Sequence, residues 1–563
     1  MTKDKYSINR RGILKTLPAG AAFAVSGCGN SEKPEQVIPV SFNHGVASGD
    51  PLHNQVIIWT RVTPTDATYA GAVSVAWQMA MDNNFNEIVK SGSFTTNPDR
   101  DFTVKEDVMG LEPAQNYFYR FMVGDEISQV GETKTLHKDG MDTIKMAVVS
   151  CSNYPFGYFH GYRAIADNGP FDVVLHLGDY IYERGDGGYG SPNAQSMGRM
   201  LDPPHEIVSL SDYRLRYALY KTDDDLQAIH RKYPFICAWD DHEFTNNSYS
   251  TGALNHDETE GDWATRRRAA TKAFMEWLPV RVPIAELPTV RSFNFGKLAT
   301  LAMLDTRIVG RERPLEYGLD VELDENQKPD YAAFHKRLEE EERSLLGAEQ
   351  EAWLDKTLEK SVTDGIPWQI LGQQIIMSYR PEPPLSSVFT PEEMKKFSGG
   401  EQLSMAVAEE QGGFYNPDAW DGYQPVRRRV FDMFEKHPGN PVVLTGDTHS
   451  CWAMSLTDKM GGKHYGAEFG TGAITSPGRG NRIGKVKQVE QAYYDHMDHM
   501  AYVSILGRGY MTLTITPEDT TASWYFVSDI EKKEFDLTKR KTLKYTLGDC
   551  ADGKVTLEDI PNK

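Results

Sequence analysis

The sequence predicts two kinds of fold in succession: an antiparallel β-sandwich, then a larger domain in which buried strands alternate with helices. Short alternating segments separated by turn residues fill residues 41–138, which is the pattern of an antiparallel sandwich. After residue 143, apolar runs alternate with long amphipathic helices, which is the pattern of a layered α/β domain. The 563 residues of the chain are enough for two or three such units.

Two short segments precede the sandwich. Arg10 and Arg11 stand ahead of the apolar stretch TLPAGAAFAV, and the tetrapeptide VSGC ends at Cys28. An arginine pair before an apolar run is typical of a twin-arginine export signal, and small residues before a cysteine are typical of a lipoprotein. We therefore expect a Tat-type lipoprotein signal over residues 1–28, lipidation at Cys28, and a polar tether over residues 29–40.

These segments also predict where the protein acts. Export by the twin-arginine route would place it in the periplasm or at the cell surface, held by the lipid at Cys28. No later stretch approaches the run of about 18 apolar residues that a membrane-spanning helix needs. The lipid anchor is therefore the only expected contact with a membrane.

The strands of the sandwich are expected in the segments QVIIWTRV, AVSVAWQMAM, EIVKSGSFTT and NYFYRFMVG. Within GLEPAQNYFYRF, the positions of Leu111, Pro113 and Tyr117 match the turn-then-tyrosine pattern of fibronectin type III domains. We expect the hydroxyl of Tyr117 to tie down a corner of the sandwich, which is a structural role.

The second domain is expected over residues 143–530. Amphipathic periodicity predicts helices over 211–232, 262–277 and 335–361. Residues 380–424 are rich in Pro, Glu and Gly and are expected to form an insertion over one face. We expect the C-terminal tail, residues 531–563, to cap the site.

Composition excludes several classes of protein. Asp and Glu number 80 against 60 Lys and Arg, so the basic surface that general nucleic-acid binding needs is missing. The five cysteines are not spaced as a disulfide framework and include no CxxC pair, which excludes a zinc ribbon. The chain has neither a GxSxG nor a GxxxxGK[ST] motif, which argues against a serine hydrolase and a P-loop enzyme.

Four apolar runs end in residues that can bind metal ions. The runs are KMAVVSC, DVVLHLGDY, PFICAWDDHE and PVVLTGDTH, and they deliver Cys151, Asp179, Asp240, Asp241, His242, Asp447 and His449. In open α/β sheets, ligands bind just beyond the carboxyl ends of the strands. Such groups would repel one another and be poorly solvated if they clustered without cations, so the recurrence predicts a metal site.

The types of ligand indicate which metals. Aspartate is a hard oxygen donor that suits calcium, magnesium, manganese or ferric iron. A tyrosinate needs a strong Lewis acid to displace its proton, since a free phenol titrates near pH ~10. We therefore expect an iron-like position near Cys151 and Tyr182, and hard-oxygen positions near Asp240, Asp241 and Asp447. Taken singly, a cysteine or a tyrosine is more often a packing residue, and we interpret Cys237 that way.

The motifs together resemble a known family. In order they are GVASGDP, IIWTRV, SC, LGDYIYE, WDDHE, LDTR, LGAEQEAWL and GDTHS. This combination is similar to that of the PhoD-type alkaline phosphatases, a family of the calcineurin-like metallophosphoesterases, and it runs from about residue 41 to about residue 515. The resemblance implies an α/β/β/α metallophosphoesterase sandwich after the fibronectin III-like domain. Twin-arginine export is also typical of that family.

The resemblance implies one Fe³⁺ and two Ca²⁺ ions. The residues that correspond to the iron ligands are Cys151, Asp179 and Tyr182. The residues implied for the calcium ions are Asp240, Asp241, Asn246 as a further candidate, Asp447 and His449. Purple acid phosphatases carry histidine where this chain has Asp447, and the change to carboxylate favours calcium over zinc. Many relatives carry H-x-H where this chain has His449 and Cys451, which leaves Cys451 as either a candidate ligand or a core residue.

A metal cluster bridged by Asp179 would bind the phosphate oxygens and generate a metal-held hydroxide for in-line attack on phosphorus. His242 is the candidate for protonating the leaving alkoxide, with the alternatives of a ligand or a hydrogen-bond donor to one. Arg307 is a candidate phosphate clamp, and a pairing with Asp305 is the alternative.

The expected function is an exported phosphoesterase for phosphate acquisition. Its substrates would be small phosphomonoesters, with phosphodiesters as a second class and no sequence-specific reading of nucleic acid. The nearest alternative is a phospholipase D or another phosphodiesterase, acting on phospholipid or nucleotide diesters at the same site. An alternative from another class is a non-catalytic, lipid-anchored binding protein that uses the sandwich for contacts.

Overall fold

The computed structural model describes residues 38–282, 287–397, 399–411, 413–414 and 416–561. The expected signal over residues 1–28, with Arg10, Arg11 and Cys28, lies outside the described residues, as does most of the tether. Among the helices of the described part, none is both long enough and apolar enough to cross a membrane.

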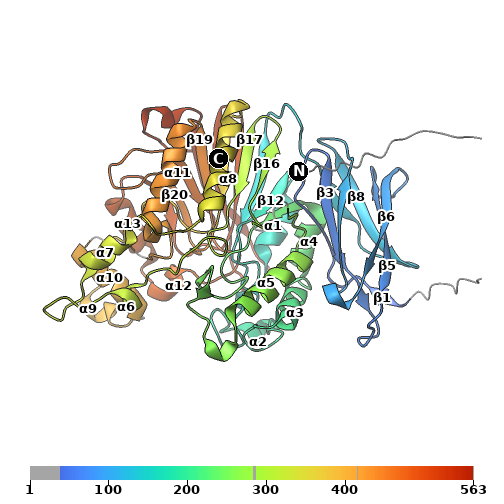
Figure 1. The fold of residues 1–563 in the computed structure, drawn as a ribbon, viewed down its shortest axis with the longest axis horizontal. Coiled ribbons are helices and arrows are strands. Elements are labelled where there is room, and N and C mark those ends of the chain that lie inside the picture. The colour runs from blue at the N-terminus through green and yellow to red at the C-terminus, as the bar shows by residue number, and fades with distance from the viewer. Residues whose placement is uncertain (1–37, 283–286, 398, 412, 415, 562–563) are drawn as a thin grey trace, which may run out of the picture. The chain divides into compact units, whose positions relative to one another are not determined.

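Two mixed β-sheets pack face to face (Figure 1). The first has ten strands, in the spatial order β26 (Glu558–Asp559), β25 (Leu537–Thr546), β24 (Asp519–Val527), β23 (Gly509–Ile515), β11 (Ile144–Val149), β12 (Val173–His176), β13 (Pro234–Cys237), β2 (Val46–Gly49), β3 (Gln55–Arg61) and β7 (Thr103–Met109). The second has seven, in the order β16 (Arg291–Phe295), β17 (Ala299–Met303), β18 (Trp368–Gly372), β19 (Asn440–Thr445), β21 (Gly466–Gly470), β20 (Cys451–Leu456) and β22 (Met500–Ser504).

The central strands are buried on both faces. In β11, Met146 and Val148 pack in the core between the two sheets, whereas Ala147 and Val149 pack in the core under the helices. Successive side chains of a strand point to opposite faces. Burial on both faces explains why these strands appear in the sequence as continuous apolar runs.

Helices cover the outer faces of both sheets. The first sheet is covered by α1 (His160–Asn168), α3 (Leu210–Tyr220), α4 (Asp224–Lys232) and α5 (Trp263–Trp277). The second is covered by α8 (Ala348–Thr363) and α11 (Gln424–Lys436). The predicted α/β/β/α sandwich is therefore confirmed.

The remaining elements are short or lie outside these layers. The helices are α2 (Ala194–Met197), α6 (Tyr317–Asp320), α7 (Tyr331–Leu338), α9 (Pro391–Met394), α10 (Gly399–Gln411), α12 (Arg479–Ile483) and α13 (Val486–His496). The short strands are β1 (Val40–Ser41), β4 (Thr63–Pro64), β14 (Ser248–Tyr249) and β15 (Gly252–Ala253).

Two of the predicted helices are each divided in the structure. The helix expected over 211–232 is α3 followed by α4, because the Asp223 side chain accepts the N–H groups of Asp225 and Leu226 and begins a new helix. The helix expected over 335–361 is α7 followed by α8. Gly347, just before α8, has a φ of 77°, a left-handed backbone that a continuous helix does not contain.

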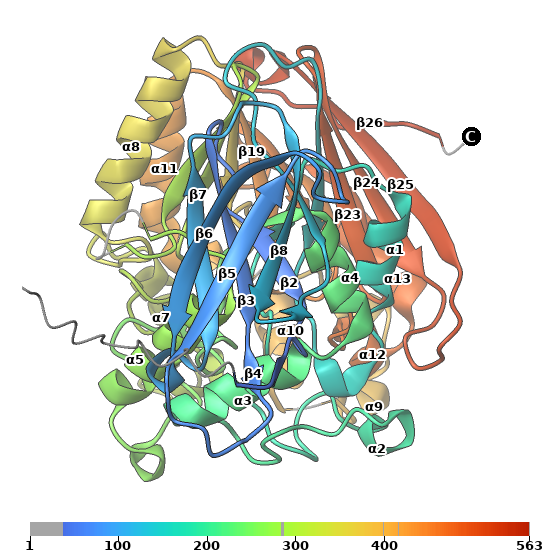
Figure 2. The same ribbon diagram turned by 90° about the vertical axis from the view of Figure 1, so that its right-hand side faces the viewer.

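The N-terminal strands belong to two sheets. One is a separate antiparallel sheet of β10 (Gly131–Lys134), β8 (Asn116–Val123), β5 (Val73–Ala80) and β6 (Ile88–Thr96), with β9 (Glu126–Ile127) paired to β8. Strands β5, β6 and β8 lie in front in Figure 2. The other N-terminal strands, β2, β3 and β7, extend the ten-stranded sheet, since β2 pairs in parallel with β13.

The N-terminal region is thus an antiparallel sandwich, as predicted, but one of its sheets continues into the sheet of the larger domain. The limits of 41–138 and 143–530 remain a prediction. The hydroxyl of Tyr117 accepts the N–H of Glu112 at 2.9 Å, which confirms the predicted corner.

Candidate metal centre

The residues of the site stand directly after the central strands. Cys151 follows β11, Asp179 follows β12, Asp240 follows β13 and Asp447 follows β19. Strands β11, β12 and β13 are parallel neighbours, so their carboxyl ends meet at one edge of the sheet. The second sheet brings β19 to the same place.

Four residues here have a left-handed backbone, which costs a non-glycine residue about 1–2 kcal/mol. Their φ angles are 60° at Cys151, 55° at Asp179, 57° at Asp447 and 55° at His449. Backbone strain that is concentrated in one place is typical of functional sites. Here it turns side chains away from their strand directions and toward one another.

Glu243 holds the turns together. Its carboxylate accepts the backbone N–H groups of Asp179 at 3.0 Å, Tyr180 at 2.5 Å and Asp240 at 2.6 Å. The side chain is fully buried, and burial together with the charge of Asp179 raises its pKa to about 8. Glu243 therefore connects the ends of β12 and β13.

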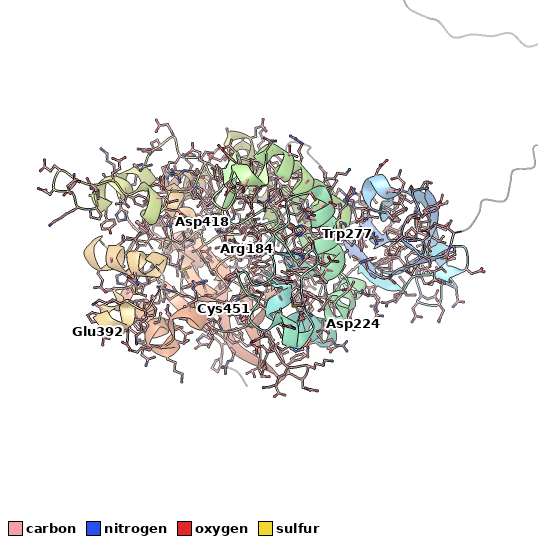
Figure 3. All side chains as sticks on the ribbon, turned by 90° about the horizontal axis from the view of Figure 1, so that it is seen from below. Arg184, Asp224, Trp277, Glu392, Asp418 and Cys451 are labelled. Atoms are coloured by element: carbon pink, nitrogen blue, oxygen red, sulfur yellow. The ribbon has the colours of Figure 1, made fainter. Side chains whose placement is uncertain are left out.

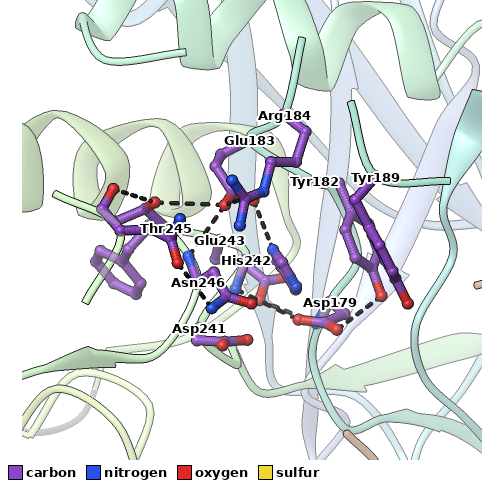
Figure 4. Close-up of polar contacts among 12 residues, drawn as sticks. Asp179, Tyr182, Glu183, Arg184, Tyr189, Asp241, His242, Glu243, Thr245 and Asn246 are labelled. Carbon is purple, nitrogen blue, oxygen red and sulfur yellow. Dashed lines mark hydrogen bonds and ion pairs between the residues drawn. The ribbon is translucent and has the colours of Figure 1, made fainter. Parts of the chain in front are cut away.

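The first ligand group contains Cys151, Asp179 and His449, each with one ligand atom within 4.8 Å of the others. The Tyr182 hydroxyl donates to Asp179 Oδ2 at 2.8 Å (Figure 4). The same hydroxyl lies 3.0 Å from His449 Nε2. Ser476 Oγ donates to the same hydroxyl at 2.6 Å. The three residues expected at the iron position therefore lie together.

The resemblance groups His449 with the residues implied for the calcium ions, without assigning ligands to individual ions. In the structure its imidazole lies with Cys151, Asp179 and Tyr182. His449 Nδ1 lies within hydrogen-bonding distance of the Tyr189 hydroxyl and of the Pro477 carbonyl. Its Nε2 therefore faces the group of Cys151 and Tyr182. Imidazole and thiolate are both softer ligands than carboxylate, so His449 and Cys151 suit the same metal ion.

Burial raises the pKa values of the Cys151 thiol and the Tyr182 phenol well above their usual ranges, and the charge of Asp179 adds to this. In the metal-free chain both groups hold their protons. A metal that binds them must displace those protons, which requires a strong Lewis acid. Burial lowers the pKa of His449, which keeps its imidazole in the neutral form that binds metals.

Two further ligand groups adjoin the first. Asp179, Asp241 and His242 form one, and Asp240, Asp241 and Asp447 form the other, again with ligand atoms within 4.8 Å. Asp179 and Asp241 each belong to two groups, so the three groups are contiguous. A shared carboxylate is the arrangement by which neighbouring cations are bridged.

The carboxylates fit hard cations. Asp240 Oδ2 and Asp241 Oδ1 are buried and accept no hydrogen bond from the described residues. A buried carboxylate oxygen without a partner is costly, and a cation supplies one. Burial raises the pKa of Asp240 well above its usual range and that of Asp447 to about 7, which is the electrostatic cost of assembling them without a cation.

Arg307 contacts carboxylates of the centre. Its guanidinium is fully buried, donates to Asp418 and to Asp447 at 2.7 Å each, and forms a close ion pair with Asp240. It is not among the residues that line the cavity described below, and its role as a phosphate clamp stays a prediction. Asp305 Oδ1 accepts the backbone N–H of Arg307 at 2.8 Å, whereas the guanidinium contacts other carboxylates.

Asp418 was not predicted. It comes from the 380–424 segment and is held by Arg307 and Arg311. Figure 3 labels it together with Arg184, which comes from a distant part of the sequence and also lines the cavity. Nothing in its local sequence marks it, because Asp418 does not follow a strand.

His242 is oriented by Glu183, which the sequence analysis did not select. Nδ1 lies 2.5 Å from Glu183 Oε2, and Glu183 Oε1 accepts the N–H of Asn246 at 3.0 Å (Figure 4). Burial lowers the pKa of His242, but Glu183, Asp241 and Asp179 outweigh it and raise that pKa well above its usual range. The pKa of Glu183 is lowered to about 2 despite burial, mainly by His242.

A cavity of about 270 Å³ opens on this centre. The predicted residues in its wall are Asp179, Asp241, His242, Asn246, Asp447 and His449. None of the described residues 531–561 lines it. The tail expected to cap the site instead supplies β25 and β26 to the sheet edge, because its backbone groups pair with β24. Cys451 and Cys237 are buried in the two cores and belong to none of the ligand groups of the described chain.

Two family models match this chain. The model of the PhoD-like phosphatase family matches residues 146–524. The model of the N-terminal domain of PhoD-like phosphatases matches residues 28–137.

Two relatives cover most of the chain. Alkaline phosphatase D of Bacillus subtilis (strain 168) is 34% identical over 520 residues, which are 90% of this chain and 80% of that protein. A solved structure titled "Structure of PhoD" superposes with a TM-score of 0.76 at 31% identity, covering 93% of this chain and 92% of that one.

Proposed function

Since the chain belongs to the PhoD-like phosphatase family, it is a phosphoesterase, and we propose that it is an exported, metal-dependent enzyme for phosphate acquisition. Phosphomonoesters would be its main substrates, with phosphodiesters as a second class. The observation that carries the proposal is the set of three contiguous ligand groups joined by Asp179 and Asp241.

The proposed metals are one Fe³⁺ and two Ca²⁺. Cys151, Asp179, Tyr182 and His449 would hold the iron, since thiolate, phenolate and imidazole suit it. Asp240, Asp241 and Asp447 would hold calcium, with Asn246 as a further donor. When bound, these ions supply Lewis-acid stabilisation of the charge on the phosphate and lower the pKa of a water that can attack phosphorus.

The proposed acid is His242. Its Nδ1 is engaged by Glu183, so Nε2 is the nitrogen that can give a proton to the leaving alkoxide. The charge of Glu183 raises the pKa of His242, which favours the protonated form that an acid needs. Tyr182 packs against the imidazole with ring centroids 4.2 Å apart and limits its motion.

The other residues of the centre hold the carboxylates in place. Glu243 fixes the backbones of Asp179 and Asp240, and Arg307 holds the side chains of Asp240 and Asp447. Catalysis of phosphoryl transfer consists mainly of positioning and electrostatic stabilisation. These contacts are therefore expected to support the rate without touching the substrate.

Metal depletion and reconstitution test the proposed metals. Chelation should abolish hydrolysis of both phenyl phosphate and diphenyl phosphate, and iron with calcium together should restore it. Iron alone or calcium alone should restore little. Full activity with zinc alone, or without any added metal, would contradict the proposed centre.

The export proposal rests on the N-terminal sequence. Replacing Arg10 and Arg11 with lysine should leave the protein inside the cell, and Cys28→Ser should release exported protein from the membrane fraction. Fractionation followed by an activity assay measures both. Normal export of the lysine variant, or membrane retention of Cys28→Ser, would contradict the signal or the anchor respectively.

A further inference from the structure

One part of the cavity wall is basic and aromatic. It contains three arginines, Arg380, Arg479 and Arg482, which we call the arginine wall, together with Trp452 and Tyr493. Arg380 lies in the segment after β18, and the other two arginines lie on α12.

Arg479 is fixed by two neighbours. Nη2 lies 2.7 Å from Glu382 Oε1, and Nη1 donates to the Tyr493 hydroxyl at 2.6 Å. That hydroxyl donates to Glu382 Oε2 at 2.8 Å, and the Glu382 side chain is fully buried. The guanidinium is therefore held in one orientation and loses little conformational freedom when it binds a ligand.

Arg380 stacks over Trp452, with its guanidinium carbon 5.0 Å from the ring centroid. Trp452 packs edge-on against Tyr493 at 5.3 Å, and its Nε1 donates to Thr448 Oγ1 at 2.8 Å. Thr448 stands between Asp447 and His449 in the chain. Trp452 and Thr448 therefore connect Arg380 to the segment that carries Asp447 and His449.

Arg482 is exposed and stands at the cavity wall. Tyr189 and His449 line the same cavity. The side chain of Arg482 therefore faces the same cavity as the first ligand group.

The cavity has two electrostatic characters. Its acidic part, with Asp179, Asp241 and Asp447, is the part suited to cations and so to the reacting phosphate. The arginine wall suits a second anion, because a planar guanidinium binds a carboxylate or a phosphate through paired hydrogen bonds. The rings of Trp452 and Tyr493 offer faces against which a planar group can pack.

We infer that the arginine wall is a second anion subsite, and that the preferred substrates are phosphate esters whose alcohol portion carries another anionic group. The inference deepens the phosphoesterase function and rests on it. A carboxylate and a second phosphate share the chemistry that the guanidinium groups recognise.

A matched pair of esters tests the inference. Phenyl phosphate and 4-carboxyphenyl phosphate differ by one carboxylate. Fructose 6-phosphate and fructose 1,6-bisphosphate form the second pair and differ by one phosphate. The metal-loaded enzyme should have a kcat/KM about ten-fold higher for the ester that carries the second anionic group, which we call the doubly anionic ester of each pair; this is the effect of one charge-assisted hydrogen bond.

Arg482→Gln should remove most of that preference, chiefly by raising the KM of the doubly anionic ester. Arg482→Lys should retain part of it, because the charge remains. Arg163→Gln, at an exposed arginine on α1 outside the cavity, is the matched control and should leave the preference unchanged. Thermal unfolding checks that each variant folds.

Two results would overturn the subsite. One is an equal kcat/KM for both members of each pair in the wild-type enzyme. The other is an equal loss for both members in Arg482→Gln, which would assign the arginine wall to the reacting phosphate. If the metal-loaded wild-type enzyme hydrolysed no ester at all, the phosphoesterase function itself would fail, and the inference with it.

Discussion

The two parts of the cavity are built in different ways. The acidic part comes from residues that follow β11, β12, β13 and β19. Glu243 binds the backbone N–H groups of Asp179 and Asp240, and Arg307 binds the carboxylates of Asp240 and Asp447. The arginine wall comes from the connection after β18 and from the short helix α12. Strand ends thus fix the reacting centre, whereas connections supply the groups that can discriminate among substrates.

This difference has a consequence for mutations. A change in the acidic part should reduce the hydrolysis of every substrate by a similar factor. A change in the arginine wall should act differently on different substrates. The predictions below concern the acidic part and the residues that support it, from the largest expected effect to the smallest.

Asp179→Asn should have the largest effect. Asp179 belongs to two ligand groups, and the loss of its charge removes several kcal/mol of stabilisation, so kcat/KM should fall at least about a thousand-fold. Assays on all four esters, with metal content measured in parallel, check this. Asp167→Asn, on the exposed end of α1, is the control. A loss confined to the doubly anionic esters would contradict the distinction between the acidic part and the arginine wall.

Glu183→Gln should lower kcat by about 10–100-fold, the usual effect of losing the partner that orients a site histidine. The charge of Glu183 raises the pKa of His242, so its loss should move the alkaline limb of the kcat profile to lower pH. The effect should be smaller with p-nitrophenyl phosphate, whose leaving group needs less help from an acid. An unshifted profile and equal losses for both leaving groups would remove His242 from the role of acid.

The metal-free protein should become less stable as the pH rises from about 4 to about 7. Burial raises the pKa of Asp447 to about 7 in the folded chain, against about 3.9 when unfolded. The folded state therefore holds more protons over this interval, and the free energy of unfolding falls with rising pH. Melting temperatures with and without calcium should diverge over the same interval. Asp447→Asn should flatten the metal-free curve, and a curve of unchanged slope would contradict the electrostatic account.

The acidic part could be predicted from sequence because its cause is local. Each of Cys151, Asp179, Asp240 and Asp447 follows a continuous apolar run, and the ends of buried parallel strands meet at one edge. The layered fold followed from the same runs. The sequence did not show which ion His449 would serve, because the direction of its side chain depends on a left-handed backbone that no residue type at that position announces.

The arginine wall could not be predicted. Arg380 and Asp418 lie in a segment without regular periodicity, and their positions depend on tertiary contacts such as those of Trp452 and Arg311. The same limit applies to the fold. The continuation of β2 into the ten-stranded sheet depends on pairing with β13, which lies far along the chain. Glu183 is marked only by its partner His242, which is distant in sequence.

The absorption spectrum of the native, metal-loaded protein tests the central claim most directly, together with the spectra of Tyr182→Phe and Tyr180→Phe. The Tyr182 hydroxyl lies at the first ligand group, whereas the Tyr180 hydroxyl lies 2.8 Å from His230 Nε2 in the core. The account predicts a tyrosinate-to-iron absorption band that Tyr182→Phe abolishes and Tyr180→Phe preserves, with iron and calcium both found by elemental analysis. A band that survives Tyr182→Phe, or active native protein without iron, would contradict the account.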